Sequence, residues 1–148
     1  MKRFSACALL VFLLSVVMAV GSVSFFGPCV HEDGSFGACH WAGQALLGIG
    51  LLLAAESLFA MLCGDSRMRQ GAFIPILFTS CLGCMIPGTL IDLCHMATMR
   101  CRALMQPAMM ILCVIAALVS LIGFFAEQRN VRATRGVQSS AEKAGKQR

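Results

Sequence analysis

The sequence predicts an all-α integral membrane protein, built as a four-helix bundle, on three observations. Of its 148 residues, 58% are hydrophobic and 13% are charged, whereas a soluble domain has roughly 45–50% and 25%. Four apolar segments are each about 20 residues long, which is enough to cross a hydrocarbon core about 30 Å thick. None of them alternates apolar and polar residues as a barrel strand does, so each is expected to be a helix. The four expected spans are residues 4–26, 41–63, 71–93 and 107–126.

The first expected span begins with Lys2 and Arg3 and then stays apolar as far as Phe26. A cleaved signal peptide has the same kind of start, and the small residues around Ala19 resemble a cleavage site. The apolar run is about 23 residues long, however, whereas the apolar region of a signal peptide has about 7–15. We therefore expect this segment to be retained as a span, with cleavage as the alternative.

Lysines and arginines are distributed unevenly between the two sides of such a bundle. The loops 27–40 and 94–106 carry only Arg100 and Arg102. The other ten lie on the side of the termini, and positive residues tend to stay in the cytoplasm. We therefore expect both termini in the cytoplasm and two short extracytoplasmic loops. The ten are Lys2, Arg3, Arg67, Arg69, Arg129, Arg132, Arg135, Lys143, Lys146 and Arg148.

The last segment, residues 127–148, is basic and polar, and we expect it to be a disordered cytoplasmic tail attracted to anionic lipid. A nucleic-acid partner is not expected. The basic residues are spread among Gly136, Ser139, Ser140 and Gly145, with no aromatic residues between them and no recognition motif.

The chain has nine cysteines, and the expected topology divides them into two groups. Cys29, Cys39, Cys94 and Cys101 fall in the outer loops, on the oxidising side, where paired thiols are normally disulfides. The other five fall in or at the ends of the spans, where cysteine usually behaves as a small apolar residue. Four outer cysteines allow three connectivities, and loop lengths do not choose between them.

The outer loops carry a distinctive pattern. Pro-Cys at residue 28 is followed by Cys-His-Trp at residue 39 and by Gln44, and the second loop reads IPGTLIDLC and then Met-Arg-Cys ending at residue 101. These residues resemble a family of small prokaryotic four-span membrane proteins, catalogued as domain of unknown function 4418, over roughly residues 5–125. The chain departs from the family pattern at Gly37, where methionine is usual, and at Leu93, where glycine is usual.

The first interpretation of the outer cysteines is structural: two disulfides stiffen the loops. A second is redox chemistry, because four spans with two cysteine-bearing outer loops are also the layout of quinone-coupled thiol oxidases similar to DsbB and the vitamin K epoxide reductases. In that case His40 beside Cys39 and His95 beside Cys94 would assist thiol exchange. No outer C-x-x-C is present, since the chain's C-x-x-C is Cys81 to Cys84 within the third expected span.

A third interpretation is a copper or zinc site, since sulfur and imidazole suit both metals. The spacings are not those of a zinc finger, and outer thiols tend to oxidise before metal arrives. We therefore predict no cofactor, with quinone, copper or zinc only under the alternative interpretations. The candidate metal ligands are His31, Cys39, His40, Cys94 and His95.

Two acids in the expected spans need partners. Asp92 would share a helical face with Cys81, Cys84, Gly88 and His95, which fits either a polar path or, as we favour, a small-residue contact strip.

Glu56 lies about 22 Å from the outer end of its span, and an intramembrane acid usually faces the bundle interior, neutral or hydrogen-bonded. Its candidate partners are Ser57, Thr79, Ser80 and Ser120.

No nucleophile elbow, phosphate loop or HExxH accompanies these residues. The resemblance implies a multi-pass protein of the prokaryotic plasma membrane with no assigned reaction, whose genes often lie near those of ABC-type export systems. We therefore expect a non-catalytic accessory or stabilising subunit of a membrane assembly, with the lipid bilayer and a membrane protein as its partners.

Overall fold

The computed structural model describes residues 6–24, 38–91 and 101–146, and these form four α-helices. A five-residue π-helix, η1, leads directly into the last helix. Within the described ranges there is no strand, only an isolated bridge between Pro87 and Ile91, so the all-α prediction is confirmed. The elements are α1 (Ala6–Val23), α2 (Ala38–Leu62), α3 (Ser66–Met85), η1 (Cys101–Met105) and α4 (Gln106–Lys146).

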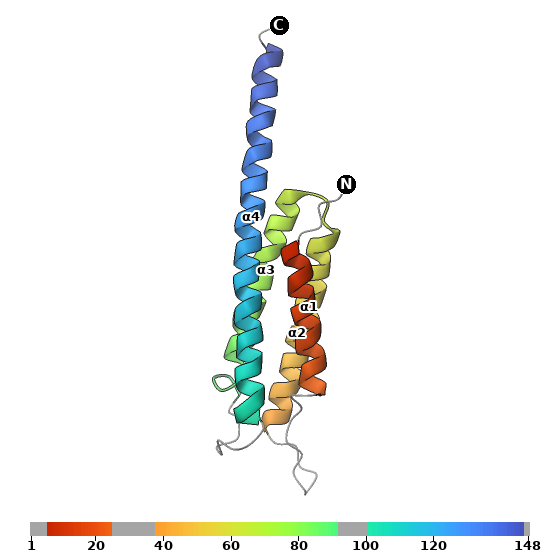
Figure 1. Cartoon of the computed structure of the whole chain (residues 1–148), viewed down its shortest axis with the longest axis vertical. Helices are drawn as coiled ribbons and strands as arrows, with labels where there is room; N and C mark the ends of the chain where they lie inside the picture. The colour runs from red at the N-terminus through yellow and green to blue at the C-terminus, as the bar shows by residue number, and fades with distance from the viewer. Residues whose placement is uncertain (1–5, 25–37, 92–100, 147–148) are drawn as a thin grey trace, which may run out of the picture.

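The four helices stand side by side, and consecutive helices run in opposite directions (Figure 1). The pairs α1–α2 and α3–α4 make the most extensive contacts, and α2–α3 and α1–α4 close the bundle. The start of α1 and the end of α4 therefore lie at the same end of the bundle, and α4 extends well beyond the other three helices (Figure 1). This is the up-down-up-down arrangement of a helical bundle.

Each helix buries a narrow stripe in the core and leaves other apolar side chains on the outside. Val11 and Met18 of α1 are fully buried, one heptad apart, as are Leu46 and Leu53 of α2. Large apolar side chains nevertheless remain exposed on every helix, such as Phe78 at 69%. A helix that is apolar all round suits lipid rather than water as its surroundings.

Three segments of the described chain are long and apolar enough to cross a membrane: Ala6–Val23, His40–Leu62 and Arg102–Ala133. The helix α3 is not among them, because it begins with the polar sequence SRMRQ and ends at Met85. The sequence predicted instead an apolar span continuing to residue 93. The difference arises at Pro87, which has no amide donor, and at Gly88, whose φ of 93° leaves the helical region.

The end of α3 also changes the helical face predicted for its residues. The turn after Met85 is closed by bonds from the amides of Leu90 and Ile91 to carbonyls five residues earlier. Cys81 and Cys84 remain on the helix, whereas Gly88 lies in this turn. The expected face running from Cys81 through Gly88 is therefore interrupted.

The long α4 differs from the prediction of a disordered tail after residue 126. It continues as helix to Lys146. Adding a residue to an existing helix avoids the cost of nucleation, and residues 127–146 are rich in alanine, glutamate, glutamine, lysine and arginine, which favour helix. The weakest helix formers in this segment are Gly136 and Gly145.

Close packing of α3 on α4 depends on Gly123. A Cβ atom at this position would lie 2.7 Å from two ring carbons of Phe73, and the Phe73 side chain is 1% exposed. The ring therefore occupies the space that the absent side chain leaves. At Gly48 of α2, by contrast, an added Cβ would meet nothing within 4 Å.

We expect Gly123→Ala to destabilise the fold by about 1–3 kcal/mol, because the buried ring must move to admit a methyl group. The matched variant Gly48→Ala should be neutral or stabilising, by up to about 1 kcal/mol, since alanine is the better helix former. Denaturant titration of helicity in detergent micelles measures both free energies of unfolding. Equal stability of the two variants would contradict the packing described.

Candidate functional site

The outer cysteine cluster predicted from the sequence lies mostly outside the described residues. This applies to Cys29, His31, Asp92, Cys94 and His95. The backbones of Cys39 and Cys101 belong to the first turn of α2 and the start of η1, but their side chains fall outside the described part. These two elements begin at the same end of the bundle (Figure 1). His40 makes an edge-to-face contact with Trp41, with ring centroids 5.9 Å apart.

The metal and redox interpretations of that cluster stay predictions. Among the described residues, no group of three or more histidine, cysteine or acidic side chains can hold a metal ion. Five cysteines with described side chains are free thiols: Cys7, Cys63, Cys81, Cys84 and Cys113.

The intramembrane acid Glu56 has one hydrogen-bond partner. The hydroxyl of Thr79 on α3 donates to Glu56 Oε1 at 3.1 Å, so Thr79 is the partner among the four hydroxyls proposed from the sequence. The hydroxyls of Ser57, Ser80 and Ser120 instead donate to carbonyls of their own helices, each at 2.7 Å. The second carboxyl oxygen of Glu56, Oε2, is buried and has no hydrogen-bond partner.

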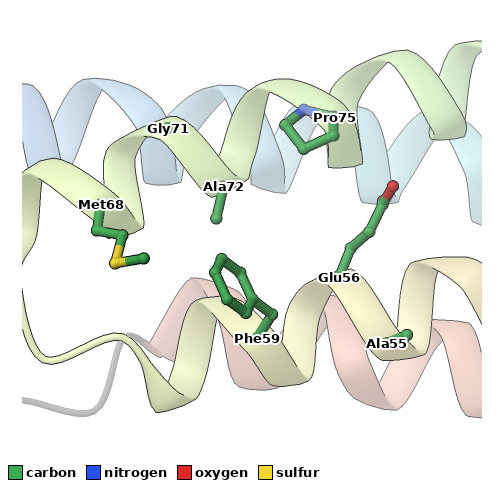
Figure 2. A pocket seen from close by; sticks show the side chains of 7 residues that line it. All are labelled: Ala55, Glu56, Phe59, Met68, Gly71, Ala72 and Pro75. Carbon is green, nitrogen blue, oxygen red and sulfur yellow. The ribbon is translucent and has the colours of Figure 1, made fainter.

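Glu56 lines an open pocket between α2 and α3, with a volume of about 450 Å³. Figure 2 shows its carboxyl group extending from α2 towards α3, while the Phe59 ring rises towards Ala72. Every other lining residue is apolar, and three of the six are alanine or glycine. The carboxyl is therefore the one charged or polar side chain in an otherwise apolar pocket. The six are Ala55, Phe59, Met68, Gly71, Ala72 and Pro75.

A second acceptor in the pocket comes from the backbone. Pro75 lies inside α3, and proline has no amide hydrogen to donate to the carbonyl four residues earlier. That carbonyl belongs to Gly71, which also lines the pocket. The pocket therefore has a carboxyl oxygen without a partner on its α2 side and a backbone carbonyl that lacks its usual helical donor on its α3 side. A group that donates hydrogen bonds is the chemical complement of this pocket.

A buried ion pair joins α3 to α4 at the end of the bundle where α1 starts. Arg69 Nη1 lies 3.0 Å from Glu127 Oε1, and the two side chains are 8% and 7% exposed. Arg69 Nη2 also donates to the carbonyl of Cys63 at 2.9 Å, and Asn130 Nδ2 donates to Glu127 Oε2 at 3.3 Å. Sequence reasoning counted Arg69 only as an orientation signal and missed its pairing with Glu127.

The sequence gives only a weak signal for this pair. The two residues are 58 positions apart, and the one indication that they pair is that opposite charges are expected at the same end of two antiparallel helices. Such a pair contributes little compared with apolar residues of the same size, but loss of one partner leaves the other charged group buried alone. Its role in the fold is therefore to fix how α3 and α4 are aligned.

One comparison with known proteins gives a match. The model of a family described as domain of unknown function (DUF4418) matches residues 11–126, which is most of the chain. The matched region contains the whole Glu56 pocket and ends one residue before Glu127. Neither the curated proteins nor the solved structures give a match.

We expect Arg69→Met to destabilise the fold by about 3–5 kcal/mol, because Glu127 would keep only Asn130 as a partner in a buried setting. The double variant Arg69→Met/Glu127→Leu should recover most of that loss, since it removes both charges. Unfolding titrations in detergent measure each change.

The control for this cycle is Arg67→Met, two residues away, where the arginine side chain is exposed. Its effect should stay within about 0.5 kcal/mol. If the double variant were no more stable than Arg69→Met, the two side chains would not act as a pair.

Proposed function

The chain belongs to the family described as domain of unknown function 4418, and we propose that it serves as a non-catalytic accessory subunit of a membrane assembly. In this proposal it crosses the prokaryotic plasma membrane four times, with both termini in the cytoplasm. The observation that carries the proposal is Glu56, an acid on an apolar helix with one carboxyl oxygen lacking a partner and an open pocket beside it.

The bundle geometry supports four crossings. The helix α3 packs against both α2 and α4 and runs antiparallel to them (Figure 1), so placing those two helices across a membrane carries α3 with them. The buried Arg69 near its start is compatible with this position, because its charge is paired with that of Glu127. Charged residues at membrane depth are tolerated when they are paired in this way.

The Glu56 pocket fits a transmembrane helix of a partner protein. An unpaired polar atom in hydrocarbon is costly, and a hydroxyl or amide on a neighbouring helix would satisfy it. Ala55, Gly71 and Ala72 leave room for close approach of another backbone, as small residues commonly do where membrane helices meet. An export assembly of the ABC type is the context that the family resemblance suggested.

The decisive test uses photo-crosslinking in cells. A photoreactive residue at Phe59, inside the pocket, should crosslink one partner protein, whereas the same residue at Ile122, exposed on α4, should not. Glu56→Leu should reduce this crosslink by about tenfold, corresponding to a loss of about 1.4 kcal/mol, because the leucine offers no hydrogen bond. Glu56→Gln should retain more of it than Glu56→Leu.

The matched control is Ser57→Ala, since the Ser57 hydroxyl bonds within its own helix and is absent from the pocket lining. It should crosslink as the native chain does. Crosslinks to a second copy of the same chain would replace the accessory role with self-association. Recovery of an uncrosslinked monomer, or a crosslink unaffected by Glu56→Leu, would contradict the proposal.

We also propose that the outer loops are held by disulfides among Cys29, Cys39, Cys94 and Cys101. The support is positional: Cys39 belongs to the first turn of α2 and Cys101 to the start of η1, and these two elements begin at the same end of the bundle (Figure 1). A four-helix bundle places both loops of one side together, so pairs within or between loops are within reach.

Differential alkylation followed by mass spectrometry should find all four outer cysteines oxidised in protein taken from cells, each bonded to another of the four. The physical reason is the oxidising compartment expected for them. A pair that is partly reduced, and that shifts when cellular quinone is depleted, would favour the redox alternative at these cysteines. Free thiols with stoichiometric copper or zinc would favour the metal alternative.

A further inference from the structure

Three thiols gather where α3 packs against α4, away from the Glu56 pocket. The Cys113 sulfur on α4 and the Cys84 sulfur on α3 are near enough to interact. The Cys84 thiol in turn lies 3.9 Å from the carbonyl oxygen of Met110, to which it donates. Cys81 is three residues before Cys84, one helical turn away. Thiols from two different helices are therefore neighbours at this seam.

The close approach of the helices holds this pair together. A Cβ atom at Gly83 would lie 2.7 Å from the Sγ of Cys113, so the sulfur rests directly on the α3 backbone beside Cys84. Cys113 is completely buried and has little freedom to move away. A disulfide requires its two Cα atoms to be about 4.4–6.8 Å apart. Because Gly83 has no side chain, the α3 and α4 backbones can approach each other closely here, which favours such a short distance.

An apolar groove leads from the lipid-facing surface to this pair. Its volume is about 320 Å³, and its lining includes Cys81, which is exposed, and Cys84, which is partly buried. Cys113 is not part of the lining and is completely buried. A molecule in the groove would therefore meet Cys84 first and would have to enter from the bilayer. The remaining lining residues are Leu77, Met85, Val114, Ala117, Leu118 and Leu121.

We propose that this groove binds a lipid-soluble quinone, which oxidises Cys84 and Cys113 to a disulfide. An apolar lining excludes charged oxidants, and quinones are two-electron oxidants that dissolve in the bilayer. In the first step the Cys84 sulfur adds to the quinone ring, and its proton goes to a quinone oxygen. The Cys113 sulfur then attacks Cys84, the carbon–sulfur bond breaks with its electron pair going to the ring, and the second proton completes the quinol.

The overall change balances: two S–H bonds are lost, one S–S bond forms, and quinone gains two electrons and two protons. The order of attack follows from access, because Cys84 lines the groove whereas Cys113 is buried and does not line it. This activity is separate from the outer cysteines, and it does not depend on the partner docking proposed at Glu56. Glu56→Leu should therefore leave it unchanged.

The test uses the full chain in lipid nanodiscs, with water-accessible thiols first blocked by a charged maleimide. Decylubiquinone is then added, its reduction is followed by absorbance, and the thiols are mapped by mass spectrometry. The native chain should reduce about one quinone per polypeptide and acquire a Cys84–Cys113 bond, as a two-electron couple requires. Cys113→Ser should lower quinol formation at least about tenfold, because the resolving thiol is gone.

Two matched controls distinguish reaction with quinone bound in the groove from unspecific reaction of quinone with thiols. Cys63→Ser, at a buried free cysteine elsewhere, should leave quinol formation unchanged. Leu118→Trp should fill the groove and slow the quinone reaction about tenfold or more, whereas Ile122→Trp, on the same helix outside the groove, should not. The small oxidant diamide should still form the bond in Leu118→Trp, which shows that the thiols and the fold remain intact.

A stable quinone adduct on Cys81 or Cys84 without a disulfide would overturn the proposal. So would equal quinol formation by the native chain and Cys113→Ser, or an unchanged rate in Leu118→Trp.

Discussion

The contact between α3 and α4 is the constraint on which the rest of the bundle depends. The helix α3 is the least suited of the four to lipid, because it begins with SRMRQ and contains Pro75. It is held along its length at three places: Arg69 on Glu127, Phe73 on Gly123, and Gly83 on Cys113. One is a buried ion pair and two are close approaches at glycine, so directional and steric complementarity together fix its alignment with α4.

Although α3 packs tightly on α4, two other parts of its surface remain open to further contacts. Towards α2, its proline and small residues form a wall opposite Glu56, and Thr79 satisfies only one carboxyl oxygen. Along its seam with α4, Cys84 lines an open apolar groove, and the Cys113 sulfur rests against the α3 backbone at Gly83. Both proposed sites thus arise where α3 meets a neighbour. In an apolar environment, such unsatisfied or reactive groups are the features that other molecules can recognise.

Hydrophobic length and topology predicted four antiparallel helices, and the cost of an intramembrane acid predicted a hydroxyl partner for Glu56, which is Thr79. Hydrophobic length did not predict where α3 ends. The sequence is apolar enough for the helix to continue to residue 93, but Pro87 and the positive φ of Gly88 end it earlier. The Arg69–Glu127 pair and the approach of Cys113 to Gly83 depend on residues far apart in sequence. Composition and periodicity carry no information about such alignments between helices.

The length of α4 bears on orientation. Its 41 residues span about 62 Å at 1.5 Å per residue, about twice the hydrocarbon thickness, so roughly half must lie outside the bilayer. That half carries Arg129, Arg132 and Arg135 and extends beyond the end where α1 starts (Figure 1). Pairing with Glu127 removes Arg69 from the positive-inside count, but these exposed arginines keep the bias on the same side. A helical tail, no less than a disordered one, therefore favours cytoplasmic termini.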